Sequence, residues 1–457
     1  MNKSDSERMA GYLEEYGLSL TEKRSEADLV IINTCGVRQS AEDRIYGLVP
    51  KIKKENKKVK IILTGCLSQR KDVKKRLEGK VDFWFPIVEL PKLAKILGLD
   101  DGKTSEYDYL KIKAKYNSKI SAFVPIGNGC NNFCAYCVVP YARGREKYRS
   151  ANEIVKEVEY LVKNGYKEIN LIAQNVNSYQ SKMDSTKKTR SSRRSAPQDD
   201  KGIVNFAKLL EKVNDIPGNF WIRFSTSHPK DMSDELIKTI ATCKKVVEHI
   251  HLPAQAGDNK VLEMMNRNYT RENYIKLVNK IKKVINNQET RNNNQKNSKF
   301  KIQNSKFCLP VSISTDIMVG FLGETRKQFE NTKKLFREVK FDLAYISQYS
   351  PRFGTTAYKL EDKISKQEKK RREEELMKIL RKTALKNNKK YIGKSVEILV
   401  TGKNKEGKYF GMTRTYKNVK IHVTQNTKHE TNLIGKFVDV KINKVKDFGL
   451  EGELVES

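Results

Sequence analysis

Gly-Cys-Asn-Asn-Phe-Cys-Ala-Tyr-Cys, residues 129–137, is the stretch that decides the architecture of this chain. It places Cys130, Cys134 and Cys137 in a C-x3-C-x2-C triplet, with no fourth cysteine or histidine close by in the sequence. Zinc usually takes four protein ligands in two pairs, so the triplet matches zinc poorly. Three thiolates suit an iron–sulfur cube with one open iron, which can chelate an amine and a carboxylate. The triplet therefore predicts an iron–sulfur site that Tyr136 shields from water; the alternative is three unliganded buried cysteines.

Composition and charge narrow the class of function. At 457 residues the chain is long enough for two or three domains. Its 90 Lys and Arg residues against 55 Asp and Glu residues give a net charge of +35, which favours a nucleic-acid partner. The alternative is a lysine-rich composition with solvated helix faces. No apolar run reaches the roughly 18 residues that span a bilayer, so we expect no membrane partner and a cytoplasmic protein.

Residues 1–100 alternate helix and strand patterns, which predict a small parallel α/β domain. Helices are expected at 4–16 and 39–54, and strands at 27–34 and 59–64. Cys35 and Cys66 each follow one of these strands, and carboxyl ends of parallel strands meet at one edge of a sheet. The shared edge favours a second metal site over two unrelated cysteines in turns.

Residues 116–359 contain six further βα units, which predict a parallel (β/α)6 partial barrel. The strands are expected at 120–126, 168–173, 220–225, 247–252, 311–319 and 342–347. The cysteine triplet follows the first strand, at the edge where such barrels carry their chemistry. Two stretches near 181–201 and 286–306 hold too few apolar residues to fold, and we expect disordered surface insertions there. His249 and His251 share one strand face and are interpreted as core histidines.

The spacing of apolar residues changes toward the end of the chain. Residues 360–392 predict a charged amphipathic linker helix, and residues 393–457 alternate apolar and polar positions as a small all-β barrel does. Lysines and arginines lie among Tyr409, Phe410 and Tyr416, a mixture that suits stacking on RNA bases beside a basic track. An ordinary β-barrel with a basic surface is the alternative. The fold class is α/β, with this all-β module at its end.

The chain resembles the radical S-adenosylmethionine (SAM) methylthiotransferases over nearly its whole length. It is most similar to the branch that makes 2-methylthio-N6-dimethylallyladenosine in tRNA. The motifs that carry the resemblance occur in order: NKSDSE (2–7), NTCGVRQSAE (33–42), GCNNFCAYCVVPYARGRE (129–146), LIAQNVNSY (171–179), RFSTSHP (223–229), HLPAQAGDNKVLEMMNRNYTRENY (251–274), TDIMVGFLGET (315–325) and YSPRFGT (349–355).

The resemblance implies three domains: an N-terminal domain with an auxiliary [4Fe–4S] cluster, the SAM-cleaving barrel, and a TRAM module that binds RNA. It assigns the triplet to the cluster that cleaves SAM, and Cys35 and Cys66 to two of three auxiliary ligands. Gln174, Arg223 and Tyr136 are expected beside bound SAM. The family's third auxiliary cysteine has no counterpart here, and we expect it to lie just before Met1, which leaves the second cluster incomplete in the chain as given.

The implied reaction adds a methylthio group to C2 of N6-dimethylallyladenosine at position 37 of tRNA. The partners would be tRNA and a low-potential electron donor such as flavodoxin or ferredoxin, with the enzyme a monomer. Alternatives are a sister enzyme acting on N6-threonylcarbamoyladenosine in tRNA or on a ribosomal protein aspartate. A further alternative is a truncated RNA-binding iron–sulfur protein that transfers no sulfur.

Overall fold

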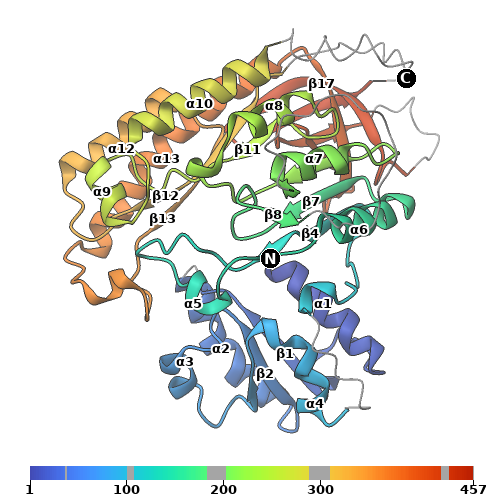
Figure 1. Cartoon of the computed structure of the whole chain (residues 1–457). Coiled ribbons are helices and arrows are strands. Elements are labelled where there is room, and N and C mark those ends of the chain that lie inside the picture. The colour runs from blue at the N-terminus through green and yellow to red at the C-terminus, as the bar shows by residue number, and fades with distance from the viewer. Residues whose placement is uncertain (37–38, 100–107, 183–201, 288–308, 424–431, 456–457) are drawn as a thin grey trace.

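Three structural parts follow one another along the chain, as the computed structural model shows (Figure 1). The structure describes residues 1–36, 39–99, 108–182, 202–287, 309–423 and 432–455. An N-terminal α/β domain, drawn in blue, lies below a larger central barrel and a C-terminal all-β module, drawn in red. No helix in these ranges is both long and apolar enough to cross a membrane.

The N-terminal domain is a parallel three-stranded sheet covered by helices. Its elements are α1 (Asn2–Glu15), β1 (Leu29–Thr34), α2 (Gln39–Glu55), β2 (Lys60–Gly65), α3 (Lys71–Arg76), β3 (Phe83–Trp84) and α4 (Leu93–Leu97), and the sheet order is β1-β2-β3. Apolar residues on the two sheet faces form two separate cores. Tyr109, Leu110 and Ile112 complete one of these cores, so the chain leaves this domain only after Ile112.

The central barrel has the six parallel strands that the sequence predicts. They are β4 (Ser121–Pro125), β7 (Glu168–Ile172), β10 (Trp221–Phe224), β11 (His249–His251), β12 (Ser312–Val319) and β13 (Leu343–Gln348). They form two three-stranded sheets, β4-β7-β10 and β11-β12-β13. A single isolated bridge, Ile222 to Val246, joins β10 to the segment before β11. The result is an open barrel with a seam in its middle, which confirms the α/β fold class.

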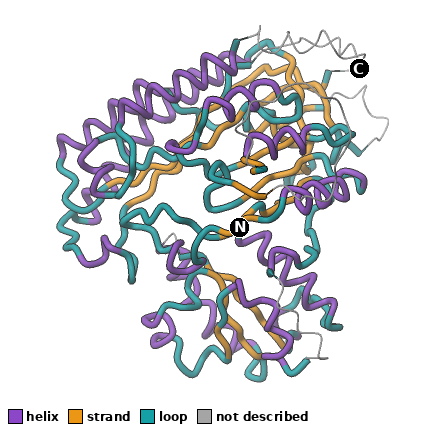
Figure 2. The backbone as a smooth tube through the Cα atoms, viewed as in Figure 1, coloured by secondary structure: helices purple, strands orange, loops and turns teal. Residues whose placement is uncertain are grey.

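Helices cover the outer face of this sheet (Figure 2). They are α6 (Ala151–Lys163), α7 (Phe206–Asn214), α8 (Asp234–Thr242), α10 (Arg271–Asn286), α12 (Arg326–Val339) and α13 (Lys366–Asn388). Their apolar faces and the outward strand residues share one large buried core. Shorter helices α5 (Val139–Arg143) and α9 (Asn259–Met264) lie in the connections that follow β4 and β11.

The concave face of the open barrel is polar, unlike the packed interior of a closed one. Glu168 accepts from the Ser121 hydroxyl at 2.8 Å. The Ser314 hydroxyl lies 2.8 Å from Nε2 of His249 and 2.9 Å from Nδ1 of His251. Both histidines are buried, and they share the inward face of β11 as their alternation predicts. Such a face can hold a polar ligand without leaving its own donors and acceptors unpaired.

The two predicted insertions lie mostly outside the described residues. Short strands β8 (Gln180–Lys182) and β9 (Ile203–Asn205) flank the first insertion and pair antiparallel with each other. They place Ser181 and Lys182 in a ladder rather than in the insertion. Asn286, at the start of the second predicted insertion, is the last residue of α10.

Helix α13 packs on the central sheet beside β13 and α12. It lies within the stretch 360–392, which was expected to be a linker. Leu376 and Leu380 are both 0% exposed and belong to the barrel core. The helix begins where the Ser365 hydroxyl accepts from the backbone N–H of Glu368 at 3.2 Å. Helix α13 therefore serves as the outer helix of the sixth βα unit as well as the connection to the C-terminal module.

Leu380→Ala tests that role of α13. We expect it to lower the free energy of unfolding of the barrel by roughly 2 to 3 kcal/mol, because a fully buried leucine leaves a cavity. Leu360→Ala is the matched control, since Leu360 is 56% exposed. Urea unfolding of both variants checks the prediction, and equal midpoints would contradict the packing of α13 in the barrel core.

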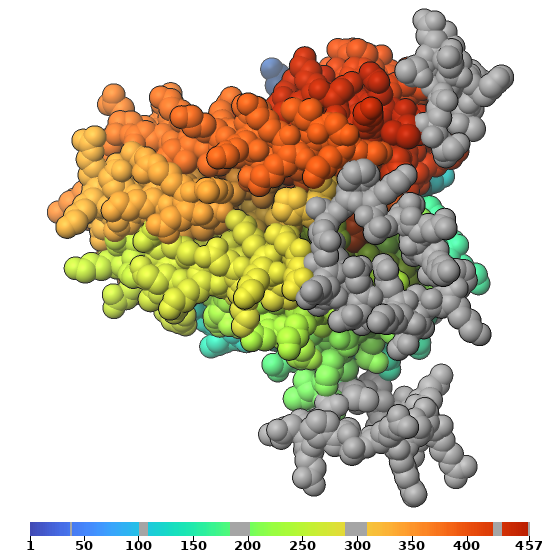
Figure 3. Space-filling view, turned by 90° about the horizontal axis from the view of Figure 1, so that it is seen from above, coloured from blue at the N-terminus to red at the C-terminus, as the bar shows by residue number. Residues whose placement is uncertain are grey.

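The C-terminal module is the closed five-stranded barrel that the sequence predicts. Its strands are β14 (Ser395–Lys403), β15 (Tyr409–Thr413), β16 (Asn418–His422), β17 (Phe437–Lys446) and β18 (Gly449–Leu454), in the order β14-β15-β16-β18-β17. Alternate apolar residues of these strands fill its core. In the view from above, the module lies against α13 (Figure 3).

Candidate functional site

The cysteine loop leaves the carboxyl end of β4. Strand β5 (Gly127–Asn128) enters the loop and pairs antiparallel with β6 (Lys147–Tyr148) at its exit, so the base of the loop is clamped. Gly129 adopts a φ of +86°, and a Cβ there would lie 2.2 Å from the carbonyl oxygen of Arg145. Only glycine satisfies both constraints, which explains the residue before Cys130.

Backbone contacts from two other connections hold the loop in place. The N–H of Ala135 donates to the carbonyl of Met265 at 3.0 Å, and the Ala135 carbonyl accepts from the N–H of Ala357 at 2.9 Å. The amide of Asn266 donates to the Phe133 carbonyl at 3.0 Å. Connections after β11 and β13 therefore fix a loop that starts at β4, and the cysteines lie over the carboxyl end of the barrel.

The three thiols of the triplet differ in their surroundings. Cys134 is 9% exposed, and its Sγ lies 3.3 Å from Nη1 of Arg267. The Sγ of Cys130 lies 3.5 Å from Nδ2 of Asn132. Burial, with the neighbouring charge of Cys134, raises the pKa of Cys137 to about 12. Burial also raises the pKa of Cys130.

The donor set fits an iron–sulfur cluster chemically. Thiols that are neutral because they are buried become ligands when a cation stabilises their thiolates. Within the ranges that the structure describes, no three His, Cys, Asp or Glu side chains converge closely enough to hold a metal ion. Cys130, Cys134 and Cys137 would hold the cluster, each through one iron.

Tyr136 lies in the apolar wall behind the triplet. Its ring meets that of Phe321 edge-on at 6.4 Å between centroids, within a small apolar cluster. Burial raises the pKa of its phenol well above the usual value. These contacts suit the water-excluding role that the sequence suggests for it.

Gln174 follows β7, and its side chain reaches the cysteine loop. Its Oε1 accepts from the backbone N–H of Gly129 at 2.7 Å. This contact fixes the residue next to Cys130, and the contact of Gln174 with SAM that the sequence suggests stays a prediction. Gln174 is thus brought together with the triplet through the loop backbone.

Arg223 is not brought to the triplet. Its Nε pairs with the carboxylate of Glu168, the first residue of β7 and thus at the amino end of the sheet. Its Nη2 donates to the Thr413 carbonyl at 2.7 Å, and its Nη1 to the Arg414 carbonyl at 3.2 Å. The guanidinium therefore points away from the cysteine loop and toward the C-terminal module.

Cys35 and Cys66 lie together as their strands predict. β1 and β2 are in register, with Thr34 opposite Gly65, so the two cysteines leave the sheet side by side. A Cβ placed on Gly36 would lie 3.1 Å from Cβ of Cys66 and 3.2 Å from a methyl of Val138. Val138 follows Cys137 directly. The segment that follows Cys35, together with Cys66, therefore packs against the end of the cysteine triplet.

A buried ion pair that sequence reasoning missed joins the N-terminal domain to the cysteine loop. Arg143 donates from Nη2 to Asp5 at 2.6 Å and to Oδ1 of Asn2 at 3.0 Å. Its Nη1 donates to Asn128 at 3.0 Å. The side chains of Arg143 and Asp5 are 2% and 1% exposed. The only signal in the sequence was that each residue lies in a family-like motif.

A second contact fixes the same interface from the far side of the barrel. Arg352, in the connection after β13, donates from Nη1 to Oε1 of Gln39 at 2.5 Å. The same guanidinium lies 3.7 Å from Glu42, and both partners belong to the first turns of α2. Arg143 and Arg352 together hold the N-terminal domain over the carboxyl ends of the barrel strands.

Comparison with known proteins covers all three parts of the chain. Family models match the radical SAM superfamily over residues 124–294, the uncharacterized protein family UPF0004 over residues 1–86, and the TRAM domain over residues 389–455. Among solved structures, the radical S-adenosylmethionine methyltransferase TsrM from Kitasatospora setae is similar at a TM-score of 0.50 and 12% identity. That match covers 78% of this chain and 73% of the other, and it shows the fold.

Curated relatives are similar along nearly the entire chain. The tRNA-2-methylthio-N6-dimethylallyladenosine synthase of Clostridium botulinum strain Hall is 40% identical over 470 residues, which cover 99% of this chain and 94% of the relative. The protein of that name in Carboxydothermus hydrogenoformans is 39% identical, covering 100% and 97%. The chain therefore belongs to the radical SAM methylthiotransferases, in the family of the tRNA-2-methylthio-N6-dimethylallyladenosine synthases.

Proposed function

We propose that this chain adds a methylthio group to C2 of N6-dimethylallyladenosine at position 37 of tRNA by radical SAM chemistry. One observation carries the proposal. The loop with Cys130, Cys134 and Cys137 lies over the carboxyl end of a polar, open barrel, and the segment that carries Cys35, beside Cys66, packs against the end of that loop from another domain. This proximity supports a site in which the triplet would provide the radical source and Cys35 and Cys66 the sulfur source.

In this proposal the triplet holds a [4Fe–4S] cluster and SAM. When bound, the cluster and SAM would supply radical chemistry that removes hydrogen from C2 of the adenine. Arg267 donates toward the Sγ of Cys134 and steadies that thiolate. Gln174 fixes the Gly129 amide, and Tyr136 with Phe321 excludes water behind the triplet. Cys35 and Cys66 contribute to an auxiliary cluster.

The net charge and the family matches support a set of binding partners. A net charge of +35 and a TRAM domain support tRNA as the macromolecular substrate. We also propose a low-potential donor of the flavodoxin or ferredoxin class, since reductive cleavage of SAM needs one electron. We place the enzyme in the cytoplasm, where tRNA is modified, and take it to act as a monomer.

Nucleoside mass spectrometry of tRNA tests the function. A host that lacks its own synthase should accumulate N6-dimethylallyladenosine, and a plasmid that encodes this chain should restore the 2-methylthio form. Restoration requires that Cys35 and Cys66 support the auxiliary cluster without the third cysteine of the family; SAM cleavage without methylthio product would favour the alternative of an iron–sulfur protein that transfers no sulfur. The Cys134→Ala variant should not restore it. Restoration of a methylthio group on threonylcarbamoyladenosine, or on a ribosomal protein aspartate in place of the tRNA base, would overturn the proposed substrate.

A further inference from the structure

The turn between β15 and β16, residues 413–417, lies across the amino ends of the central barrel strands. Arg414 makes a bidentate ion pair with Glu248, through Nε at 2.8 Å and Nη2 at 2.9 Å. Its Nη2 also donates to the carbonyls of Val246 at 2.7 Å and Lys244 at 2.9 Å. One arginine of the C-terminal module thus binds the segment that leads into β11 through two of its three nitrogens.

Two further contacts extend this turn to strands on both sides of the barrel seam. Arg223 of β10 donates to the carbonyls of Thr413 and Arg414. Lys417 pairs with Asp342, just before β13, at 2.8 Å, and its side chain is 7% exposed. The turn therefore connects β10 with the approaches to β11 and β13, across the place where a single bridge joins the two sheets.

Tyr416 reaches into the concave face of the barrel from this turn. Its φ is +62°, which is unusual for a residue with a side chain. The ring stacks on His249 with 4.5 Å between centroids and 12° between planes, yet Tyr416 remains 39% exposed. The sequence suggested that Tyr416 stacks on RNA bases, whereas here it covers a barrel histidine.

A polar chain runs upward from that stacked pair. His249 bonds to Ser314, Ser314 bonds to His251, and Nε2 of His251 lies 3.4 Å from Asp316, whose side chain is 39% exposed. Every link is a side chain on the concave face of β11 or β12. A shift of Tyr416 would therefore change the positions of His249 and, through Ser314, of His251 on the concave face of the barrel.

We propose that the C-terminal module closes the amino end of the central barrel, with Arg414 holding it there and Tyr416 forming the floor of the reaction space. This role is additional to RNA contact. A reactive carbon radical attacks whatever lies nearest, so the space around it must be closed and dry. Arg414 and Tyr416 are positioning residues: they act through the barrel side chains that they cover.

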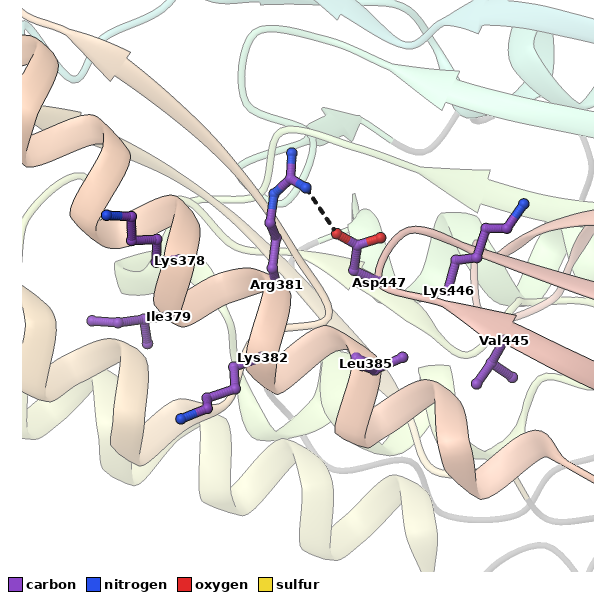
Figure 4. A pocket seen from close by; sticks show the side chains of 8 residues that line it. All are labelled: Lys378, Ile379, Arg381, Lys382, Leu385, Val445, Lys446 and Asp447. Carbon is purple, nitrogen blue, oxygen red and sulfur yellow. Dashed lines mark ion pairs between the residues drawn. The ribbon is translucent and has the colours of Figure 1, made fainter.

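A second contact between the module and the barrel supplies a matched control. In the groove between α13 and the β17–β18 turn, Arg381 pairs with Asp447 at 3.3 Å beside Lys378, Lys382 and Lys446 (Figure 4). The Arg381 side chain is 61% exposed, so this pair contributes little to holding the module. Arg381→Ala and Arg414→Ala each remove one arginine from the same domain interface.

Trp221 reports on the closure without any bound cluster. It is 2% exposed, and its ring lies 4.9 Å from Phe437 and 5.8 Å from the guanidinium carbon of Arg414. The chain has two tryptophans, so Trp84→Phe leaves Trp221 as the single emitter. In that background, Arg414→Ala should raise acrylamide quenching about twofold or more, because local opening exposes the ring. Arg381→Ala should leave quenching unchanged.

A second readout uses the reconstituted enzyme. Arg414→Ala and Tyr416→Ala should raise the ratio of 5′-deoxyadenosine to methylthio product, while tRNA affinity stays close to that of the parent chain. Arg381→Ala, which removes the exposed pair with Asp447, should leave the ratio unchanged. The proposal is wrong if Arg414→Ala and Tyr416→Ala match their controls in both readouts. If Arg414→Ala fails to fold, Tyr416→Ala decides, since its ring is partly exposed. The quenching result stands whatever the methylthio acceptor is.

Discussion

Cys134→Ala is expected to abolish SAM cleavage and with it all methylthio transfer. Cys134 is the middle thiol of the triplet and is 9% exposed, and its Sγ lies 3.3 Å from Nη1 of Arg267. Two remaining thiolates cannot hold a four-iron cube that leaves one iron open for SAM. Anaerobic reconstitution, followed by an assay of 5′-deoxyadenosine in the presence of dithionite, measures the effect.

Cys243→Ala is the control for this loss. Cys243 ends α8 and is buried in the apolar core of the barrel at 8% exposure, remote from any proposed ligand set. It should keep full SAM cleavage after reconstitution. Substantial 5′-deoxyadenosine from Cys134→Ala, or an equal loss from Cys243→Ala, would show that the triplet is not the cleavage site.

Arg143→Met is expected to lower the free energy of unfolding by about 3 to 5 kcal/mol, because it leaves the buried Asp5 carboxylate without its partner. The two side chains are 2% and 1% exposed at a separation of 2.6 Å. Denaturant unfolding, followed by circular dichroism, measures the change. The same variant should loosen the N-terminal domain from the cysteine loop, since Arg143 also binds Asn2 and Asn128.

A double-mutant cycle separates the buried charge from lost packing. Asp5→Asn combined with Arg143→Met should regain much of the stability, because no unpaired charge remains. Arg271→Met is the control: its pair with Glu338 has the same 2.6 Å separation, but Glu338 is 49% exposed. That control should cost less than about 1 kcal/mol. A double variant no more stable than Arg143→Met would refute the stranded-charge explanation.

Much of the fold was predictable because burial leaves a local pattern. The six barrel strands are short apolar runs, and each lies within two residues of its expected bounds. The five-stranded module shows period two, and the in-register ends of β1 and β2 bring Cys35 and Cys66 together as predicted. In each case the pattern that identifies the element also fixes the face or the edge it presents.

The other features depend on which surfaces of the domains pack against each other, and no local pattern in the sequence encodes that packing. Arg143 and Asp5 are 138 residues apart, and each alone resembles an ordinary surface charge. Arg223 lies in a strand whose carboxyl end faces the site, but its guanidinium reaches toward the amino end. Tyr416 lies in a basic β-module, yet its partner is His249. Side-chain direction and the packing of the domains determine the contacts of all three residues.

The turn between β15 and β16, residues 413–417, is synthesised after the barrel that it covers, and this order affects folding during synthesis. The ribosome makes the chain from its amino end, so all six barrel strands emerge before residues 413–417 do. During that interval Trp221 and Val247 lack the cover of Leu399 and Phe437, and a single bridge joins the two half-sheets. The nascent barrel therefore presents apolar surface until the C-terminal module has been made, and during this time chaperones and aggregation compete for it. Strands that lie more than 170 residues after β10 thus cover a side chain of β10 itself.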